Sequence, residues 1–304
     1  MFTTLAIANI IIYLCSHNNQ YETMKKQYLF SLVAMMVILC SCGSSDKSNK
    51  IDYSNDSTTC QFSNIQQTRI YRYINDENDT VYYEGTFTAF WPLVINGKPC
   101  AGLQDALLRA MTDSAQLNTL DKVIDYHLMP LDYEELDSTK VIQVKAITGK
   151  DAKISNNDIL LRLQDMSERL LTYHIKSESY YYGAAHGIYA NNYVTYDLKL
   201  NKAVALNDIV ADTTLLRNTI LRAIKDTYDY DRGDLFIPDN GLLPLPSDFY
   251  IQGQVLHVVY QVYEIASYAQ GMIDAPIYPY LLKPEETKRL FTPYGLELME
   301  YPTE

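Results

Sequence analysis

Alternation of apolar and polar residues predicts several strands in the middle of the chain. Ile65 to Ile74 and Val81 to Phe90 both alternate from residue to residue, and the polar run Asn75 to Asp79 separates them, which predicts a β-hairpin. The same alternation predicts further strands at Val141–Thr148, Asp158–Gln164, Arg169–Tyr182 and Tyr189–Leu198. Because short polar turns join most of these strands, we expect a mostly antiparallel sheet.

Helical spacing of apolar residues appears in two regions. Between Gly102 and Gln116, Leu103 and Leu107 recur at the spacing of one helix face, and Asp121–His127 predicts a second short helix. Further along, Asp212 is a suitable N-cap for a helix from Thr213 to about Tyr228.

The C-terminal part alternates between turn signals and short elements. Asp229–Pro246 is rich in Pro and Gly and predicts a surface loop. Phe249–Ile251 and Val255–Tyr263 predict a hairpin, Ile273–Tyr278 a last strand, and Pro284–Leu290 a closing helix. The predicted fold class is therefore α+β, with mostly antiparallel sheets, helices packed on one face, and two intimately associated subdomains at 60–155 and 156–304.

The N-terminal segment resembles a bacterial lipoprotein signal. Met24-Lys25-Lys26 is followed by an apolar run and then by Leu39-Cys40-Ser41-Cys42, in which Cys42 would carry the lipid after cleavage. A transmembrane helix is the alternative, but the apolar run of about ten residues is well short of the roughly 20 that span a bilayer.

This resemblance divides the N-terminal part of the chain. Residues 24–41 form the expected signal peptide, and residues 1–23 are then an extension upstream of the true start. Residues 42–59 are rich in Ser, Asn, Asp and Lys and predict a flexible tether. The expected location is the cell envelope, lipid-anchored at Cys42, on the outer membrane or facing the periplasm in a Gram-negative cell.

Charge and composition narrow the partners. The chain has 25 Lys and Arg against 37 Asp and Glu, a formal net charge of −12, which argues against nucleic acid. The chain has 27 Tyr against 8 Phe and 1 Trp. Because tyrosine combines an apolar ring with a hydroxyl, this composition suits strands with one face exposed to water.

Two cysteines remain after processing. Cys60 and Cys100 would lie in an oxidising compartment, where a disulfide between them would close a loop of about 40 residues and stabilise by roughly 4 kcal/mol. Two unpaired buried thiols are the alternative.

Two segments carry a family resemblance. Tyr180-Tyr181-Tyr182-Gly183-Ala184-Ala185-His186-Gly187, followed by Tyr196-Asp197-Leu198, resembles the extracytoplasmic domain shared by the lysozyme-sensing anti-sigma factor RsiV and the peptidoglycan deacetylase PdaC. Tyr263 to Gly271, with Tyr263-Glu264 and Tyr268, is similar to the C-terminal signature of that family. Residues 65–116 resemble the domain that usually precedes it. The resemblance implies a module that binds a protein such as lysozyme, or a wall glycan.

The resemblance does not extend to the activities of those relatives. RsiV-like proteins carry a cytoplasmic segment and a transmembrane helix, and a lipoprotein signal with a tether stands in their place here. PdaC-like enzymes carry a separate metal-dependent deacetylase domain, whose Thr-Phe-Asp-Asp motif is missing from this sequence. Sigma-factor control and deacetylation are therefore not expected.

Candidate chemistry centres on His186 and Glu264. Gly183 and Gly187 beside His186 permit close approach of a ligand, so the imidazole could act in a site. The alternative is that these glycines let two strands turn while His186 bonds a neighbouring carbonyl or carboxylate. Glu264 follows an apolar strand pattern, and together with His186 it would be a natural acid-base pair.

Binding without catalysis is the leading hypothesis. We expect a non-catalytic, lipid-anchored envelope module that binds a protein or glycan, with ligand contacts at Tyr182, Gly183, His186, Gly187, Tyr263, Glu264 and Tyr268. An envelope polysaccharide hydrolase that uses His186 and Glu264 is one rival, and a structural envelope lipoprotein is the other. No metal or cofactor is expected, because the histidines lack a familiar ligand spacing.

Overall fold

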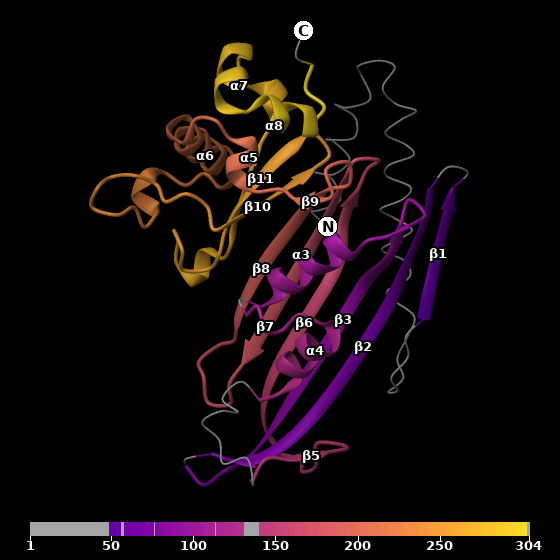
Figure 1. Cartoon of the computed structure of the whole chain (residues 1–304). Helices are drawn as coiled ribbons and strands as arrows, with labels where there is room; N and C mark the ends of the chain where they lie inside the picture. Colours follow the sequence, from indigo (N-terminus) through magenta and orange to yellow (C-terminus); the bar gives the residue numbers. More distant parts are fainter. Residues whose placement is uncertain (1–48, 56–57, 76, 113, 131–139, 303–304) are drawn as a thin grey trace, which may run out of the picture. The chain divides into compact units, whose positions relative to one another are not determined.

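The computed structural model describes residues 49–55, 58–75, 77–112, 114–130 and 140–302 (Figure 1). The expected upstream extension, the signal peptide and Cys42 lie outside the described residues. No described helix has the length and apolar character needed to cross a bilayer.

A long, curved sheet forms the body of the molecule (Figure 1). Its strand order is β1-β2-β3-β6-β7-β8-β9, with β4 beside β3 and β5 beside β2. Every pair is antiparallel except β3 with β6. The strands are β1 (Asn49–Asn55), β2 (Thr58–Ile74), β3 (Thr80–Ile95), β4 (Lys98–Pro99), β5 (Ile142–Val144), β6 (Lys153–Met166), β7 (Leu170–Tyr180), β8 (Ile188–Asp197) and β9 (Lys202–Ala203).

Two helices cover one face of this sheet. They are α3 (Ala101–Met111) and α4 (Leu120–Leu128), which the spacing of apolar residues predicts, although α3 ends earlier than expected. Their buried leucines pack on inward-facing residues of the strands in a first core, for example Leu107 and Leu128 against Phe87, Leu161 and Tyr173.

A smaller sheet and four helices form the second layer. The sheet order is β10-β11-β12, all antiparallel. The elements are β10 (Asp248–Gln252), β11 (Val255–Tyr260), β12 (Ile273–Ile277), α5 (Leu206–Ile209), α6 (Thr213–Tyr228), α7 (Pro284–Leu290) and α8 (Pro293–Leu298), with short 3-10 turns at Arg232–Asp234, Tyr268–Gln270 and Pro279–Leu281. Helix α6 packs against the small sheet in a second core, where Ile220 and Ile224 meet Val258 and Ala275.

Helix α6 confirms its predicted cap. The Asp212 carboxylate accepts a hydrogen bond from the Leu215 amide at 2.9 Å, which satisfies one of the free donors of the first turn. The helix ends at Tyr228, and the following residue, Asp229, has a φ of 59°, the left-handed conformation common after a helix.

The two cores meet at β7, not at the predicted subdomain boundary. Leu170 belongs to the second core, whereas its neighbour Leu171 belongs to the first, because successive residues of a strand point to opposite faces. The boundary expected between residues 155 and 156 falls inside β6, a strand that is continuous with the rest of the large sheet. The fold class is α+β as predicted, but the large sheet continues across the subdomain boundary that the sequence predicts.

Three local expectations need correction. Residues 49–55, expected in the tether, form β1 along β2. The strand expected at Val141–Thr148 shrinks to Ile142–Val144, and the one expected to reach Tyr263 ends at Tyr260. Glu264 therefore lies in a turn and not in a strand.

Candidate functional site

His186 lies in the loop that joins β7 to β8. Gly183 has a φ of +90°, and a Cβ on Gly187 would stand 2.9 Å from the Ser179 carbonyl oxygen, so both positions favour glycine. The exposed His186 ring donates from Nδ1 to the Gly187 carbonyl at 2.8 Å. This is the bond to a neighbouring carbonyl that the structural alternative predicts, although the ring is exposed.

The turn after β11 presents a second exposed ring. Tyr263 has a φ of 67°, a left-handed conformation that is unfavourable for an aromatic residue, and it is 53% exposed. The Glu264 carboxylate stabilises this turn. It accepts hydrogen bonds from the backbone N–H of Gln261 at 2.8 Å and from the Ser247 hydroxyl at 2.7 Å.

These two segments meet through their rings. The imidazole of His186 stacks on Tyr268 with centroids 4.1 Å apart, and the Tyr268 hydroxyl donates to the Gly187 carbonyl at 2.7 Å. Tyr263 and Tyr189 lie beside Tyr268, with centroids at 5.5 and 6.1 Å. We refer to His186, Tyr189, Tyr263 and Tyr268 as the ring cluster.

The loop between α6 and β10 extends this apolar surface. Phe236 is 53% exposed, and its amide donates to the Ile265 carbonyl at 2.8 Å. The Gln270 side chain donates to the Asp234 carbonyl at 3.3 Å. Phe236 is thereby held next to the turn that carries Tyr263 and Tyr268.

Two predicted site residues do not join the ring cluster as expected. The Tyr182 amide donates to the Ser155 hydroxyl at 2.9 Å, and Lys153 lies 5.1 Å from its ring centre, so Tyr182 faces the start of β6. Glu264 and His186 are both described, and no hydrogen bond or ion pair joins them.

Side chains fasten the turn to the edge of β8. The side-chain amide of Gln261 accepts a hydrogen bond from the backbone N–H of Asn191 at 2.9 Å. It also donates one to the backbone carbonyl of Asn191 at 2.7 Å, as a neighbouring strand would. The Asp248 carboxylate accepts from the Tyr193 amide at 2.6 Å. Burial raises the pKa of Asp248 to about 7, and the negative charge of Glu264 adds to that effect.

A row of four rings lies where the two sheets meet, and no pattern in the sequence predicts it. The rings of His174, Tyr193, Tyr250 and His257 stack in that order, with successive centroids 4.8, 4.2 and 4.3 Å apart. We call this set the ring row. His174 and Tyr193 are cross-strand partners in the large sheet, and Tyr250 and His257 are cross-strand partners in the small sheet.

Hydrogen bonds fix both ends of the ring row. At one end His174 accepts at Nδ1 from Arg162 Nε at 2.9 Å and donates from Nε2 to Asn191 at 2.7 Å. Burial lowers the pKa of His174 to about 4, so the imidazole is neutral at pH 7. At the other end Asp274 bonds His257 Nδ1 at 2.9 Å and the Tyr250 hydroxyl at 2.7 Å.

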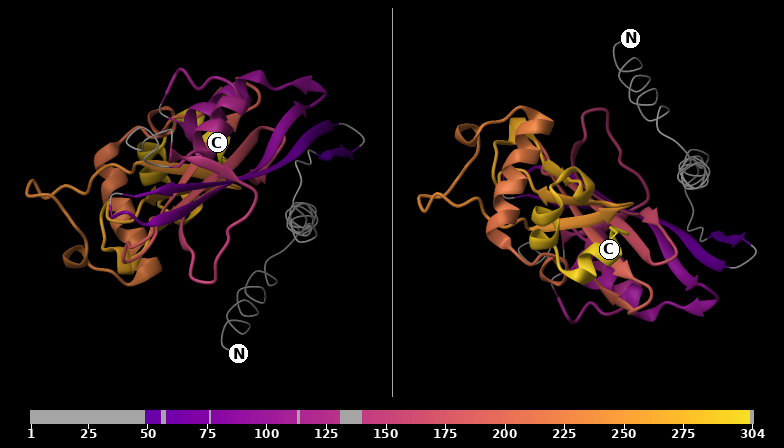
Figure 2. Two further views of the ribbon diagram at one scale, coloured as in Figure 1. Left: turned by 90° about the horizontal axis from the view of Figure 1, so that it is seen from below. Right: turned by 90° about the horizontal axis from the view of Figure 1, so that it is seen from above.

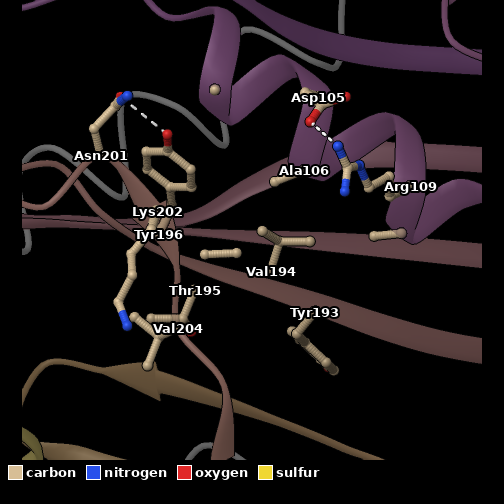
Figure 3. Close-up of a pocket in the computed structure, with 13 residues that line it drawn as sticks. Asp105, Ala106, Arg109, Tyr193, Val194, Thr195, Tyr196, Asn201, Lys202 and Val204 are labelled. Carbon is tan, nitrogen blue, oxygen red and sulfur yellow. Dashed lines mark hydrogen bonds and ion pairs between the residues drawn. The ribbon is translucent and has the colours of Figure 1, made fainter. Parts of the chain in front are cut away.

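A separate pocket of about 430 Å³ lies between α3 and the β8–β9 edge (Figure 3). Its charged side chains are already paired: Asp105 with Arg109 at 2.6 Å, and Lys202 with Asp208 at 3.0 Å. The Tyr196 hydroxyl donates to Asn201 at 3.0 Å. The pocket contains none of the predicted site residues and no arrangement of free reactive groups.

Cysteines and metal ligands complete the inventory of reactive groups. Cys60 and Cys100 are free, buried thiols within the first core, and burial raises the pKa of Cys100 to about 11. The structure thus shows the unpaired alternative and not the disulfide. Among the described residues, no three His, Cys, Asp or Glu side chains come together as metal ligands.

Comparisons with known proteins identify a related family. Residues 196–278 match the family model described as "Protein of unknown function (DUF3298)". A crystal structure of a DUF3298 family member from Bacteroides fragilis matches with a TM-score of 0.52 and 19% identity, covering 78% of this chain and 96% of that chain. A DUF3298 family protein from Pseudomonas aeruginosa matches with a TM-score of 0.48 and 13% identity, covering 86% and 99%.

The matched segment includes β10 to β12 and the turn with Tyr263, Glu264 and Tyr268, but not His186. No curated protein matches the chain. The chain is therefore similar to DUF3298 proteins in sequence over residues 196–278, and it shares its fold with the Bacteroides fragilis member of that family.

Proposed function

We propose that this protein is a lipid-anchored binding protein of the cell envelope, whose RsiV/PdaC-like module holds a ligand at the ring cluster without catalysing a reaction. The observation that carries the proposal is the exposed, strained Tyr263 within a set of rings drawn from two distant segments. The lipoprotein-like signal at residues 24–41, followed by Cys42, supports the anchoring.

The strain at Tyr263 supports a functional role. A non-glycine residue in the left-handed region costs about 1–2 kcal/mol, and burial does not offset this cost because half of the ring is in solvent. The bonds made by Gln261 and Glu264 hold the turn in this conformation. Strained residues that are held by their surroundings cluster at binding sites.

The ring cluster suits either a protein or a glycan. Tyrosine rings offer an apolar face together with a hydroxyl, a combination enriched at interfaces. Phe236 enlarges the apolar surface, and the formal charge of −12 favours a partner that carries positive charge. The family resemblance implies two ligand classes, a lysozyme-like protein and a peptidoglycan fragment.

The two rival functions have less support. An acid-base mechanism needs His186 and Glu264 to cooperate, but His186 bonds Gly187 whereas Glu264 bonds Gln261 and Ser247. A purely structural lipoprotein gives no reason to keep a strained tyrosine on the surface.

Calorimetric titration tests the proposal. Lysozyme and soluble muropeptides are titrated separately into the wild-type protein and into Tyr268→Ala, which removes the central ring. We expect one of the two ligands to bind and Tyr268→Ala to weaken it at least about tenfold, since central aromatic anchors are worth about 2 kcal/mol or more.

The matched control is Tyr126→Ala, because Tyr126 is an exposed tyrosine of α4 outside the ring cluster. It should bind like the wild type. Absence of binding by both ligands, or equal losses in both variants, would count against the ring cluster as a ligand site.

A further inference from the structure

The ring row lies between two polar sheet faces. Arg162, His174 and Tyr193 are cross-strand neighbours on β6, β7 and β8, so their side chains share one face of the large sheet. The first core packs on the opposite face through Leu171 and Tyr173. Figure 2 shows the second layer beside the large sheet, and Tyr250 and His257 of that layer continue the stack.

The two ends of the row differ in how their charges are satisfied. Both oxygens of Asp274 are engaged, one by His257 and the other by Tyr250. Arg162 uses only its Nε, which donates to His174. Within the described part of the chain, no carboxylate forms an ion pair with Arg162, and its two terminal nitrogens have no hydrogen-bond acceptor.

His174 cannot balance this charge. Because Nδ1 accepts from Arg162 Nε and Nε2 donates to Asn191, the hydrogen bonds require the neutral imidazole. The guanidinium is therefore a half-buried cation without a counter-ion in a protein of formal charge −12.

Tyr193, the neighbour of His174 in the ring row, carries a second free donor. The ring of Tyr193 stacks on His174, to which Arg162 is bonded. The Tyr193 hydroxyl has no hydrogen-bond partner among the residues that the structure describes, and it is not fully buried. The two terminal nitrogens of Arg162 and the hydroxyl of Tyr193 are thus three free donor groups at the ring row.

We propose that Arg162 and Tyr193 form a binding site for a carboxylate. The planar fork of an arginine matches the two oxygens of a carboxylate, and such paired, charge-assisted hydrogen bonds are stronger than neutral ones. The Tyr193 hydroxyl adds a third donor. The site is distinct from the ring cluster and shares no residue with it.

The carboxylate can come from an acidic sugar or from a peptide, and small acids separate these sources. Glucuronate represents the sugar, N-acetylglycine represents the peptide, and glucose and N-acetylglycinamide are their uncharged counterparts. Each is titrated into the purified full-length protein at pH 7 and followed by NMR chemical shifts. We expect at least one acid to bind and its uncharged counterpart not to bind.

Variants assign the binding to the two side chains. Arg162→Lys keeps the positive charge and loses the fork, and Tyr193→Phe keeps the stacked ring and loses only the hydroxyl. We expect Arg162→Lys to weaken binding of the acid by at least about tenfold, and Tyr193→Phe to weaken it severalfold. Arg72→Lys is the matched control, since Arg72 is an exposed arginine of β2 outside every ion pair of the described residues, and it should bind as the wild type does.

Unchanged melting temperatures of Arg162→Lys and Tyr193→Phe will show that these variants fold. The proposal is overturned if neither acid binds the wild type, or if both variants bind the acid as tightly as Arg72→Lys does. These outcomes are distinguishable from those for the ring cluster, because the ring cluster is tested with Tyr268→Ala, whereas the small acids are tested with Arg162→Lys and Tyr193→Phe.

Discussion

The imidazole of His186 lies flat on the ring of Tyr268, with centroids 4.1 Å apart and ring planes 23° apart. A hydrogen bond from the Tyr268 hydroxyl to the Gly187 carbonyl fixes the same contact at 2.7 Å. The loop after β7 and the turn after β11 are thereby joined into one exposed surface.

Replacing Tyr263 by glycine should make the protein more stable and less able to bind. Glycine adopts a φ of 67° without the strain that tyrosine has, so the free energy of unfolding should rise by about 1 kcal/mol. Urea denaturation measures this gain, and ligand titration measures the loss of binding. Tyr263→Ala is the control, because alanine removes the ring but keeps the strain. A Tyr263→Gly protein that is less stable than Tyr263→Ala would show that the turn is not strained.

His186→Ala should affect binding more than stability. The ring is exposed and its hydrogen-bond partner is the adjacent carbonyl, so no buried group is left unpaired. Loss of the stack on Tyr268 should lower the unfolding free energy by less than about 1.5 kcal/mol. Thermal denaturation gives the stability, and a large drop in melting temperature would instead assign His186 a structural role.

Acid should destabilise the junction of the sheets through His174. Its folded-state pKa is about 4, below the ordinary histidine value of 6.5, because burial disfavours the charged ring beside Arg162 and Lys176. Stability from this group is therefore fully present above pH 6.5 and is lost as the pH falls through about 4. His174→Gln should flatten the dependence of unfolding free energy on pH between these values.

Asp248 affects the pH dependence of the unfolding free energy in the opposite direction. Its pKa is raised to about 7 by burial, so it favours the folded state at low pH, and this contribution is lost as the pH rises from about 4 through 7. Urea denaturation of the wild type and His174→Gln at several pH values separates the two groups. An unchanged slope in His174→Gln would contradict the assignment to His174.

Membrane attachment should depend on Cys42. Replacing Cys42 by Ala removes the residue to which the lipid is attached, so the protein should leave the membrane fraction or accumulate as a precursor. Fractionation followed by mass spectrometry of the N-terminus checks this. A mature N-terminus other than a lipid-modified Cys42 would disprove the anchor.

Elements whose side chains show a clear period were predicted well. Helix α6 begins after Asp212 as expected, because a capping carboxylate and an apolar stripe are local signals. Strands β6 to β8 follow their alternating pattern. By contrast, β1 is not predicted, because most of its residues are polar and its strand character comes from pairing with β2.

The site was only partly predictable. The apolar pattern of Val255–Tyr263 continues through Tyr263, but β11 stops at Tyr260 because Gln261 pairs with the edge of β8. The ring row could not be foreseen, since stacking of Tyr193 on Tyr250 depends on how two separate sheets meet. Such contacts arise from tertiary packing and leave no local pattern.

NMR of protein labelled with 3-fluorotyrosine tests most directly whether the ring cluster is the ligand site. Single Tyr→Phe variants assign the resonances, and the ligand is whichever of lysozyme or muropeptide binds in calorimetry. We predict that Tyr189, Tyr263 and Tyr268 shift on ligand addition, while the exposed Tyr126 and Tyr280 do not. Shifts confined to tyrosines outside the ring cluster would contradict the account.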